Sequence, residues 1–396
     1  MVLTFNMVQS IAFAVVLLLI GELLVKKINF LSKYCIPAPV VGGLIFAIIA
    51  LILRQTGTLS FEFDDTLRVL AMTAFFTSVG FSASFGLLKK GGLKVFIFLG
   101  AAIVLVVFQN VLGVSLAKLF NLNPLIGLAT GSIPMTGGHG TASSFGPLME
   151  KAGAVGANAV AVASATFGLV AGSMLGGPVG KRLIEKYNLK SGGNKSVGFE
   201  VEQLDDSVKP LVPKNFYTAT FEIIIAMGLG TLVSAFIGKY MTFPPYIGAM
   251  LVGAIIRNVS DATKSYKVPI VEIDLIGGVS LSLFLSMALM MLKLWELAEL
   301  AIPMIVMLLA QTVLMYFYAN LVTFRVMGKD YDAAILTAGH CGFGLGATPN
   351  GIANMTSVTE KYGPSPTAFF IMPLVGSLFI DFFNPAIITF FLNMFK

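Results

Sequence analysis

The chain has 396 residues, of which 56% are hydrophobic and only 12% are charged, and its mean hydropathy is +0.88. Soluble domains carry about a quarter charged residues, so this composition excludes an ordinary soluble protein and indicates a polytopic membrane protein. The net charge of +6 does not indicate a nucleic-acid partner, because the basic residues lie in short loops between apolar segments.

Ten apolar segments are long enough, or nearly long enough, to cross a bilayer, which takes about 20 residues. Helices satisfy all of their backbone polar groups internally, so we expect an all-α polytopic membrane protein with ten transmembrane helices. The first segment lacks a basic region before it and is expected to stay as a span rather than be removed as a signal peptide. The segments are residues 7–25, 38–53, 67–87, 93–118, 152–180, 216–238, 244–257, 273–292, 300–324 and 364–393.

The basic residues predict the orientation of these helices. When the N-terminus is placed outside, most of the 26 Lys and Arg residues fall in the inside loops, as the positive-inside rule requires. Ten spans then return the C-terminus to the outside, so both termini are expected on the periplasmic or extracellular face. Residues 185–215, which are polar and contain Pro210 and Pro213, are expected to form a cytoplasmic linker.

The linker separates two halves, residues 1–184 and 216–396, that resemble each other at a spacing of about 200 residues. The sequence V-F-Q-N-V-L at 107–112 corresponds to L-A-Q-T-V-L at 309–314, and G-G-H-G at 137–140 corresponds to A-G-H-C-G at 338–342. Each half has five predicted spans, an odd number, so the second half must be inverted relative to the first. This pattern predicts two inverted-topology repeats, with a solute site at the interface between them.

Each half also contains a glycine-rich polar stretch between its fourth and fifth spans. We expect these stretches, at about 121–146 and about 331–357, to be re-entrant hairpins, because irregular backbone inside a bilayer is tolerated only where protein or a wet cavity surrounds it. The first would enter from outside and the second from inside, so that their tips meet near the middle of the membrane.

The first tip has the residue types that bind a small anion. Glycines allow the backbone to approach a ligand closely, and a half-helix beginning at or after Thr141 would point free N–H groups at a carboxylate. Its candidate substrate-binding residues are Thr136, Gly137, Gly138, His139, Gly140 and Thr141.

The second tip has a similar composition. Thr348 is interpreted as an N-cap, with Pro349 at the first helical position. The only two histidines of the chain, His139 and His340, lie in the two tips and could bind the substrate or hold the backbone. The candidate substrate-binding residues of this tip are His340, Gly342, Gly344, Gly346, Thr348 and Asn350.

Polar side chains within apolar spans are further functional candidates. Gln109, Asn110, Gln311 and Asp381 are the candidate sodium ligands, and Asp381 could alternatively accept the ammonium group of an amino acid. Cys35 and Cys341 are interpreted as packing residues, so neither a metal site beyond sodium nor a cofactor is expected.

These features favour a secondary transporter for a small polar solute. A gated channel is the alternative, although the sequence has no charged ring of the kind that lines selective pores. A membrane enzyme would need an activated nucleophile or a metal cluster, and two histidines with few intramembrane carboxylates argue against one, so the protein is not expected to be an enzyme.

Several stretches resemble the bacterial sodium/glutamate symporters. They include T-G-G-H-G-T at 136–141, A-T-F-G-L-V at 165–170, S-L-S-L-F-L-S-M-A-L-M-M-L-K-L-W-E-L-A at 280–298, A-G-H-C-G-F-G-L-G-A-T-P at 338–349 and I-A-N-M at 352–355. The resemblance extends over nearly the whole chain and implies sodium-coupled uptake of L-glutamate across the inner membrane. It also implies a homodimer with an elevator-like transport domain, and a site formed by both tips. Other small carboxylates or amino acids remain alternative substrates.

Overall fold

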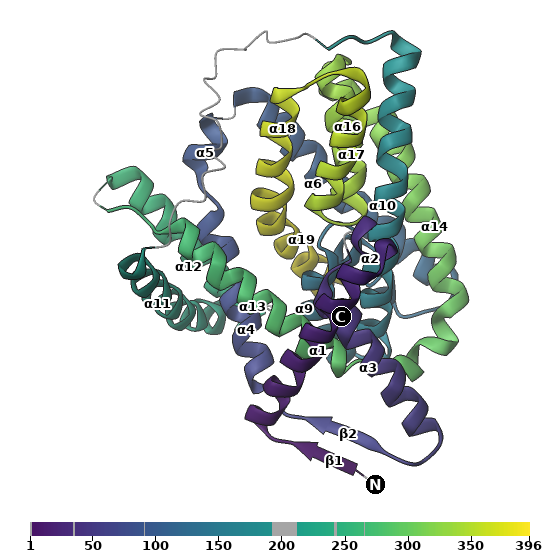
Figure 1. Cartoon of the computed structure of the whole chain (residues 1–396), viewed down its shortest axis with the longest axis vertical. Coiled ribbons are helices and arrows are strands. Elements are labelled where there is room, and N and C mark those ends of the chain that lie inside the picture. The colour runs from purple at the N-terminus through teal and green to yellow at the C-terminus, as the bar shows by residue number, and fades with distance from the viewer. Residues whose placement is uncertain (1, 35, 91, 192–211, 241–243, 265) are drawn as a thin grey trace.

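The structure is a computed structural model that describes residues 2–34, 36–90, 92–191, 212–240, 244–264 and 266–396 (Figure 1). Apart from one pair of short strands, the described elements are helical, as the composition predicts. The predicted linker falls largely on residues 192–211, outside the described part, as does Cys35. The helix before the linker continues to Tyr187 and the helix after it begins at Pro213, so both extend into the range predicted as linker.

The first half begins with β1 (Val2–Phe5), which pairs in parallel with β2 (Ser60–Phe63), Val2 lying opposite Ser60. This pair lies at one end of the molecule, and the C-terminal ends of α10 (Ala157–Tyr187) and α17 (Thr348–Tyr362) lie at the other (Figure 1). The helices of this half are α1 (Met7–Lys27), α2 (Asn29–Lys33), α3 (Ala38–Gln55), α4 (Thr66–Ser82), α5 (Phe85–Lys90), α6 (Gly92–Leu119), α7 (Pro124–Leu128), α8 (Ser132–Met135), α9 (Gly138–Lys151) and α10 (Ala157–Tyr187).

The second half also combines long helices with short and interrupted ones. Two of its segments are π-helical, a geometry that often marks functional positions. Its elements are α11 (Pro213–Ile237), α12 (Pro245–Thr263), α13 (Ile270–Met290), the 3₁₀ segment η1 (Leu294–Leu300), α14 (Ala301–Tyr318), the π segment η2 (Ala319–Thr323), α15 (Phe324–Val326), α16 (Tyr331–Leu345), α17 (Thr348–Tyr362), α18 (Pro366–Pro373), the π segment η3 (Leu374–Phe379) and α19 (Ile380–Phe395).

Eight helical stretches in the described part of the chain are long and apolar enough to cross a membrane. Two further predicted spans coincide with α4, which has 17 residues, and with α12, whose second half carries the ion pair between Arg257 and Asp261 at 3.0 Å. A multi-pass membrane protein is therefore established, while the number of ten spans stays a prediction. The eight stretches are Met7–Lys27, Ala38–Gln55, Gly92–Leu119, Ala157–Tyr187, Pro213–Ile237, Ile270–Met290, Ala301–Val326 and Pro366–Phe395.

The predicted span at 67–87 is interrupted in the structure. Helix α4 ends at Ser82, and the chain continues as α5 from Phe85. Asn258 of α12 holds this break from both sides, because its side chain accepts a hydrogen bond from Phe85 N at 2.8 Å and donates one to the carbonyl oxygen of Ala83 at 2.8 Å. The interruption therefore comes from a tertiary contact that has no local signal in the sequence.

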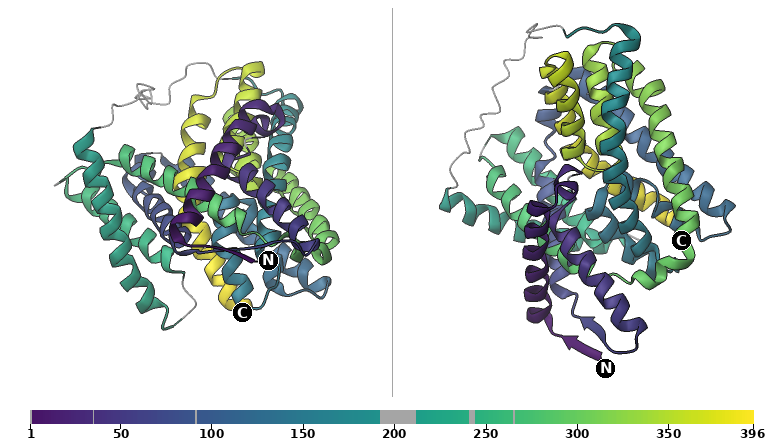
Figure 2. Two further views of the ribbon diagram at one scale, coloured as in Figure 1. Left: turned by 60° about the horizontal axis from the view of Figure 1, so that its bottom comes forward. Right: turned by 45° about the vertical axis from the view of Figure 1, so that its right-hand side comes forward.

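The helices pack in two groups. In the first, α4 packs against α12 and α13, α11 packs against α12, and α1 and α3 pack against each other and against α13. In the second, α10 packs against α9, α16 and α17, while α6 packs against α7 and α14. Figure 2 shows α11 and α12 on one side of the molecule and α10, α14, α16 and α17 on the other. The candidates that line a cavity lie where these two groups meet.

Glycines allow α10 and α16 to approach closely. A Cβ atom added at Gly168 of α10 would overlap the carbonyl oxygen of Leu345 in α16, and one added at Gly172 would lie 3.1 Å from the carbonyl oxygen of Cys341. Without water to drive apolar association, membrane helices depend on such close contacts. Buried Cys341 lies in this contact, consistent with its interpretation as a packing residue.

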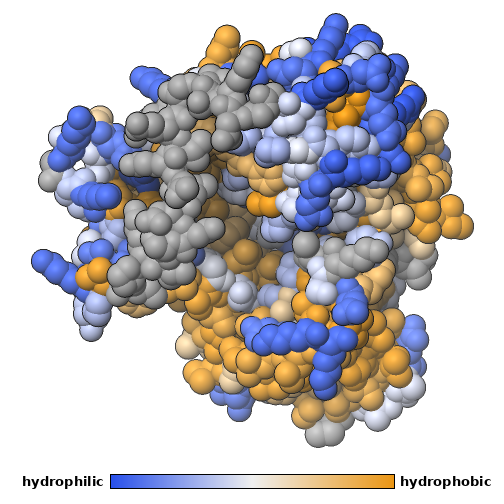
Figure 3. All heavy atoms as spheres, turned by 45° about the horizontal axis from the view of Figure 1, so that its top comes forward, coloured by the Kyte–Doolittle hydropathy of each residue, from blue (hydrophilic) through white to orange (hydrophobic). Residues whose placement is uncertain are grey.

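The surface is divided by polarity. On the face in Figure 3, hydrophobic side chains cover the lower flank, and hydrophilic residues gather toward the upper edge. Large exposed apolar side chains are concentrated on the long helices, among them Phe221, Leu232 and Phe236 of α11, each more than 60% exposed. Such a surface suits a hydrocarbon environment.

Candidate functional site

The two glycine-rich stretches form helix breaks that meet. The first break lies between α8 and α9, at Thr136 and Gly137, and the second lies between α16 and α17, at Gly346 and Ala347. Gly138 has a φ of +60°, and a Cβ atom added there would lie 3.3 Å from the carbonyl oxygen of Gly346. The positive φ and the close approach both require glycine at position 138.

A cavity of about 300 Å³ opens beside the two breaks. This volume is at the lower end of the range for small-molecule sites. One wall comes from both breaks, from α10 and from η3 with the start of α19, and the other comes from Pro37 before α3, from α4 and from α13. The lining residues are Pro37, Phe75, Phe76, Val79, Thr136 to Thr141, Leu169, Leu281, Leu285, Gly346 to Pro349, Gly376, Ser377 and Asp381.

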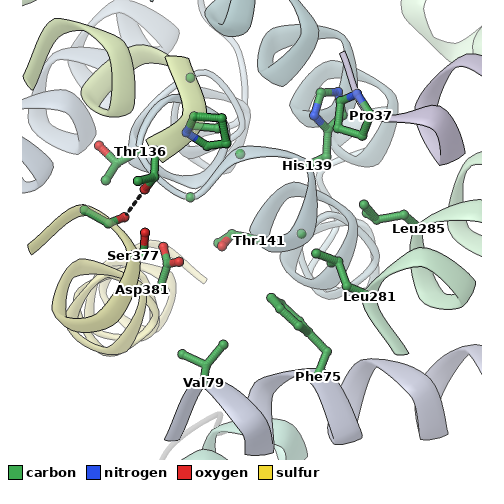
Figure 4. Close-up of a pocket in the computed structure, with 18 of the residues that line it drawn as sticks. Pro37, Phe75, Val79, Thr136, His139, Thr141, Leu281, Leu285, Ser377 and Asp381 are labelled. Carbon is green, nitrogen blue, oxygen red and sulfur yellow. Dashed lines mark hydrogen bonds between the residues drawn. The ribbon is translucent and has the colours of Figure 1, made fainter. Parts of the chain in front are cut away.

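Three side chains that face this cavity have unpaired polar oxygens. Thr141, Ser377 and Asp381 make no side-chain hydrogen bond or ion pair with any described residue. Figure 4 shows Ser377 and Asp381 beside each other and facing Thr141, with Phe75 and Leu281 on other sides of the same space. Thr141 is buried, whereas Ser377 and Asp381 are partly exposed, so all three oxygens are available to a solute or water bound in the cavity.

The first break places a helix N-terminus at the cavity. Helix α9 begins at Gly138 with Gly137 as its N-cap, so the predicted start at or after Thr141 is wrong by about one turn. Glycine at the N-cap has no side chain, so no capping hydrogen bond fixes where the helix begins, and helical backbone starts directly after Gly137. The N–H groups of Gly138, His139 and Gly140 precede the first intrahelical bond, and together with the helix dipole they favour a bound anion.

The second break offers fewer donors. The N-cap of α17 is Ala347 rather than Thr348, so the predicted capping role of Thr348 is wrong. Instead, the Thr348 hydroxyl donates to the carbonyl oxygen of Gly376 in η3 at 2.6 Å, which ties this tip to the π segment. Pro349 has no N–H, and the N–H of Asn350 donates to the carbonyl oxygen of Ala347 at 3.0 Å. The backbone N–H groups without an intrahelical partner are therefore more numerous at the first tip.

Gln109 of α6 connects the two tips from behind. Its Nε2 donates to the carbonyl oxygen of Gly344 at 2.6 Å, and its Oε1 accepts from the hydroxyl of Thr136 at 2.8 Å. Gln311 of α14 donates to the backbone carbonyl oxygen of Gln109 at 2.8 Å. Both glutamines are fully buried and neither lines the cavity, so they join the two halves of the chain behind Thr136.

The two histidines have different surroundings. His139 lines the cavity, and its Nε2 lies 2.9 Å from the hydroxyl of Thr166. That hydroxyl donates to the carbonyl oxygen of Val162 at 3.2 Å, so the neutral imidazole is assigned Nε2–H and an unprotonated Nδ1. His340 is fully buried away from the cavity, where Nδ1 lies 2.9 Å from the hydroxyl of Thr323 and the ring stacks on Phe343 at 4.8 Å.

The other sequence candidates lie behind the tips. The Oδ1 atom of Asn110 accepts from Ser132 N at 2.9 Å, and Asn350 donates to the carbonyl oxygen of Leu169 at 2.8 Å. Gly342 and Gly344 lie within close helix contacts. These residues support the tips in this structure, and their roles as ligands stay predictions. The candidates that line the cavity are Thr136, Gly137, Gly138, His139, Gly140, Thr141, Gly346, Thr348 and Asp381.

Sequence reasoning missed several lining residues. Ser377 lies one turn before Asp381, and helical spacing from that aspartate could have identified it. Phe75, Leu281, Leu285 and Pro37 are apolar residues of apolar segments, and nothing in their local sequence separates a cavity wall from a lipid contact. Among the described residues there is no cluster of three or more His, Cys, Asp or Glu side chains that could hold a metal ion.

Comparisons with known proteins agree with this arrangement of motifs. The model of the sodium/glutamate symporter family matches residues 3–364. The chain is 43% identical over 386 residues to the sodium/glutamate symporters of Escherichia coli K12 and Shigella flexneri, covering 96% of each chain. It is 41% identical over 393 residues to that of Haemophilus influenzae, covering 97% of this chain and 96% of the relative. The resemblance found in the motifs is thus confirmed, and the chain belongs to the sodium/glutamate symporter family.

Proposed function

We propose that this protein carries L-glutamate together with sodium across the bacterial inner membrane, and that glutamate binds in the cavity where the two tips meet. The observation that carries the proposal is the convergence, in one cavity of about 300 Å³, of a helix N-terminus, unpaired hydroxyl groups and a single carboxylate. Membership of the symporter family supplies the substrate and the coupling ion. Sodium is here a transported substrate, not a resident cofactor.

In this proposal a carboxylate of glutamate accepts hydrogen bonds from the N–H groups of Gly138, His139 and Gly140. The free hydroxyl of Thr141 donates to the same carboxylate or to the second one. Thr348 lines the cavity from the opposite tip. The cavity has no Lys or Arg side chain among its lining residues, so substrate charge must be balanced by backbone dipoles and by the transported cations.

Sodium prefers oxygen ligands, which the tips supply as backbone carbonyls. Gln109, Asn110, Gln311 and Asp381 remain the candidate side-chain ligands. Of these, Gln311 Oε1 is buried without a partner among the described residues, while the side-chain oxygens of Gln109 and Asn110 already accept hydrogen bonds. A sodium ion near Gln311 would therefore pair an otherwise unsatisfied atom.

The architecture proposed for transport has ten spans in two inverted repeats, with the broken segments entering the membrane as re-entrant hairpins. The repeated helix–break–helix order of the two halves and the meeting of their tips support it. The concentration of Lys and Arg residues in every second loop supports the orientation with both termini outside. An elevator-like motion is supported by the site's position between two separately packed helix groups, and a homodimer is supported by the family resemblance.

Uptake by purified protein in proteoliposomes tests this function. Radiolabelled L-glutamate should accumulate above its external concentration when a sodium gradient points inward, and should not accumulate when choline replaces sodium at a fixed membrane voltage. Uptake that is unchanged in choline contradicts sodium coupling. If the uptake rate does not saturate with glutamate concentration, and internal glutamate never exceeds its external concentration, the protein would instead be a channel, the alternative left open by the sequence.

A further inference from the structure

Asp381 is the one carboxylate among the described residues that line the cavity, and none of these residues is a Lys or Arg. It lies in the first turn of α19, directly after the π segment η3, and Ser377 lies one turn earlier on the same face. Figure 4 shows both side chains directed into the cavity. A carboxylate in this position faces the solute rather than the protein.

Within the described part of the chain, Asp381 has neither an ion-pair partner nor a side-chain hydrogen bond. A charge in a water-poor membrane site is costly unless it is paired, and intramembrane carboxylates usually face a transport pathway. A charged Asp381 must therefore be paired from the cavity, either by a cation or by the ammonium group of the solute.

The opposite side of the same cavity favours negative charge. Gly138, His139 and Gly140 of the first turn of α9 line the cavity, their N–H groups precede the first intrahelical bond, and Figure 4 shows the Thr141 side chain between His139 and Asp381. The cavity thus has an anion-binding end and a cation-binding end. An amino acid has both charges on neighbouring groups, whereas a simple dicarboxylate has only negative ones. The polarity of the cavity matches an amino acid better than a dicarboxylate.

The geometry points to Asp381 as the residue that selects amino acids, by pairing with the α-ammonium group of the substrate, with Ser377 supplying a second oxygen. This inference rests on the proposed function, because it assigns one end of the glutamate site. The inference also removes Asp381 from the set of sodium ligands, because its carboxylate is then paired with the ammonium group. The negative charges of the two substrate carboxylates are balanced instead by the N-terminus of α9 and by sodium.

The test compares L-glutamate with glutarate, which has both carboxylates but no amino group. Binding to purified protein in sodium is measured from the ligand-induced rise in unfolding temperature, which reports affinity without requiring transport. In Asp381→Asn, affinity for glutamate should fall by roughly 30-fold or more, because a desolvated charge pair is lost. Affinity for glutarate should stay the same or increase, because a repulsive carboxylate is removed. The sodium concentration that gives half-maximal glutarate binding should not change.

Equal losses for both ligands, or a higher sodium requirement for glutarate, would overturn the inference and identify Asp381 as a sodium ligand. If the unmodified protein shows no sodium-dependent glutamate binding, the proposed function fails instead. Glu22→Gln, an exposed change on α1, is the control and should alter neither affinity.

A second variant keeps the inference testable if Asp381→Asn does not fold. Asp381→Glu lengthens the side chain by one methylene group, so its carboxylate lies further into the cavity. Compared with the unmodified protein, this variant should therefore bind the shorter L-aspartate better relative to L-glutamate. The ratio of the two affinities should shift toward aspartate by about tenfold, the order expected when one methylene group no longer fits its site. An unchanged ratio would contradict pairing between Asp381 and the ammonium group.

Discussion

Gly168→Ala should lower the unfolding temperature and abolish most glutamate uptake. The added methyl group would overlap the carbonyl oxygen of Leu345, a backbone atom of α16 that cannot rotate away. Overpacking of this kind typically costs about 1–3 kcal/mol. Leu345 directly precedes Gly346 at the second break, so displacement of α16 moves the tip itself. We expect a loss of uptake of more than about tenfold, measured in proteoliposomes alongside thermal unfolding in detergent.

Gly177→Ala is the matched control, since it makes the same change on the same helix. No atom lies within 4 Å of a Cβ added at Gly177. Alanine stabilises helix interiors by about 0.5–1 kcal/mol relative to glycine, so the unfolding temperature should stay the same or rise slightly. Equal effects of the two substitutions would show that the close approach of α10 and α16 has no part in holding the tip.

Gln109→Met should remove the hydrogen bonds that connect the two tips, while the methionine side chain keeps a shape similar to that of glutamine. Methionine removes the donor to Gly344 and the acceptor for Thr136, and each polar group left unpaired in a buried site costs about 1–3 kcal/mol. The apparent affinity for glutamate should fall by about 10-fold to 100-fold. The measurement is the concentration dependence of uptake, together with direct binding in sodium.

Ser115→Ala is the control for this variant, because Ser115 lies on the same helix with its side chain exposed. It should leave both binding and uptake unchanged. If Gln109→Met binds glutamate normally, the hydrogen bonds behind the tips do not position the site. A change confined to the sodium dependence would favour the role of Gln109 as a sodium ligand, as its position in the sequence first suggested.

The meeting of the two helix breaks beside a cavity could be predicted, because polar, glycine-rich backbone is rare in apolar segments and costly in a bilayer. The same argument failed for individual residues. His139 and His340 have similar neighbours in the sequence, yet the helix break precedes His139 and follows His340. Consequently only His139 reaches the cavity, while His340 lies within α16 among aromatic rings. Local sequence does not specify on which side of a glycine-rich motif the helix will break.

The remaining differences come from contacts between distant segments. The break after Ser82 depends on Asn258, and the wall formed by Phe75 and Leu281 depends on how α4 and α13 face the tips. The π segment η3, which brings Gly376 within reach of Thr348, was also not predicted. An apolar segment predicts that a helix forms and enters the membrane. It does not predict which face of the helix lies against lipid and which lines a cavity, because both faces are apolar.

The central claim is that the two glycine-rich tips together enclose the substrate. An experimental structure of the protein in sodium and L-glutamate tests it most directly. We expect one glutamate molecule between residues 136–141 and 346–348, with a carboxylate at the N-terminus of α9 and the ammonium group at Asp381. Glutamate bound elsewhere, with this cavity empty or filled by side chains, would contradict the account.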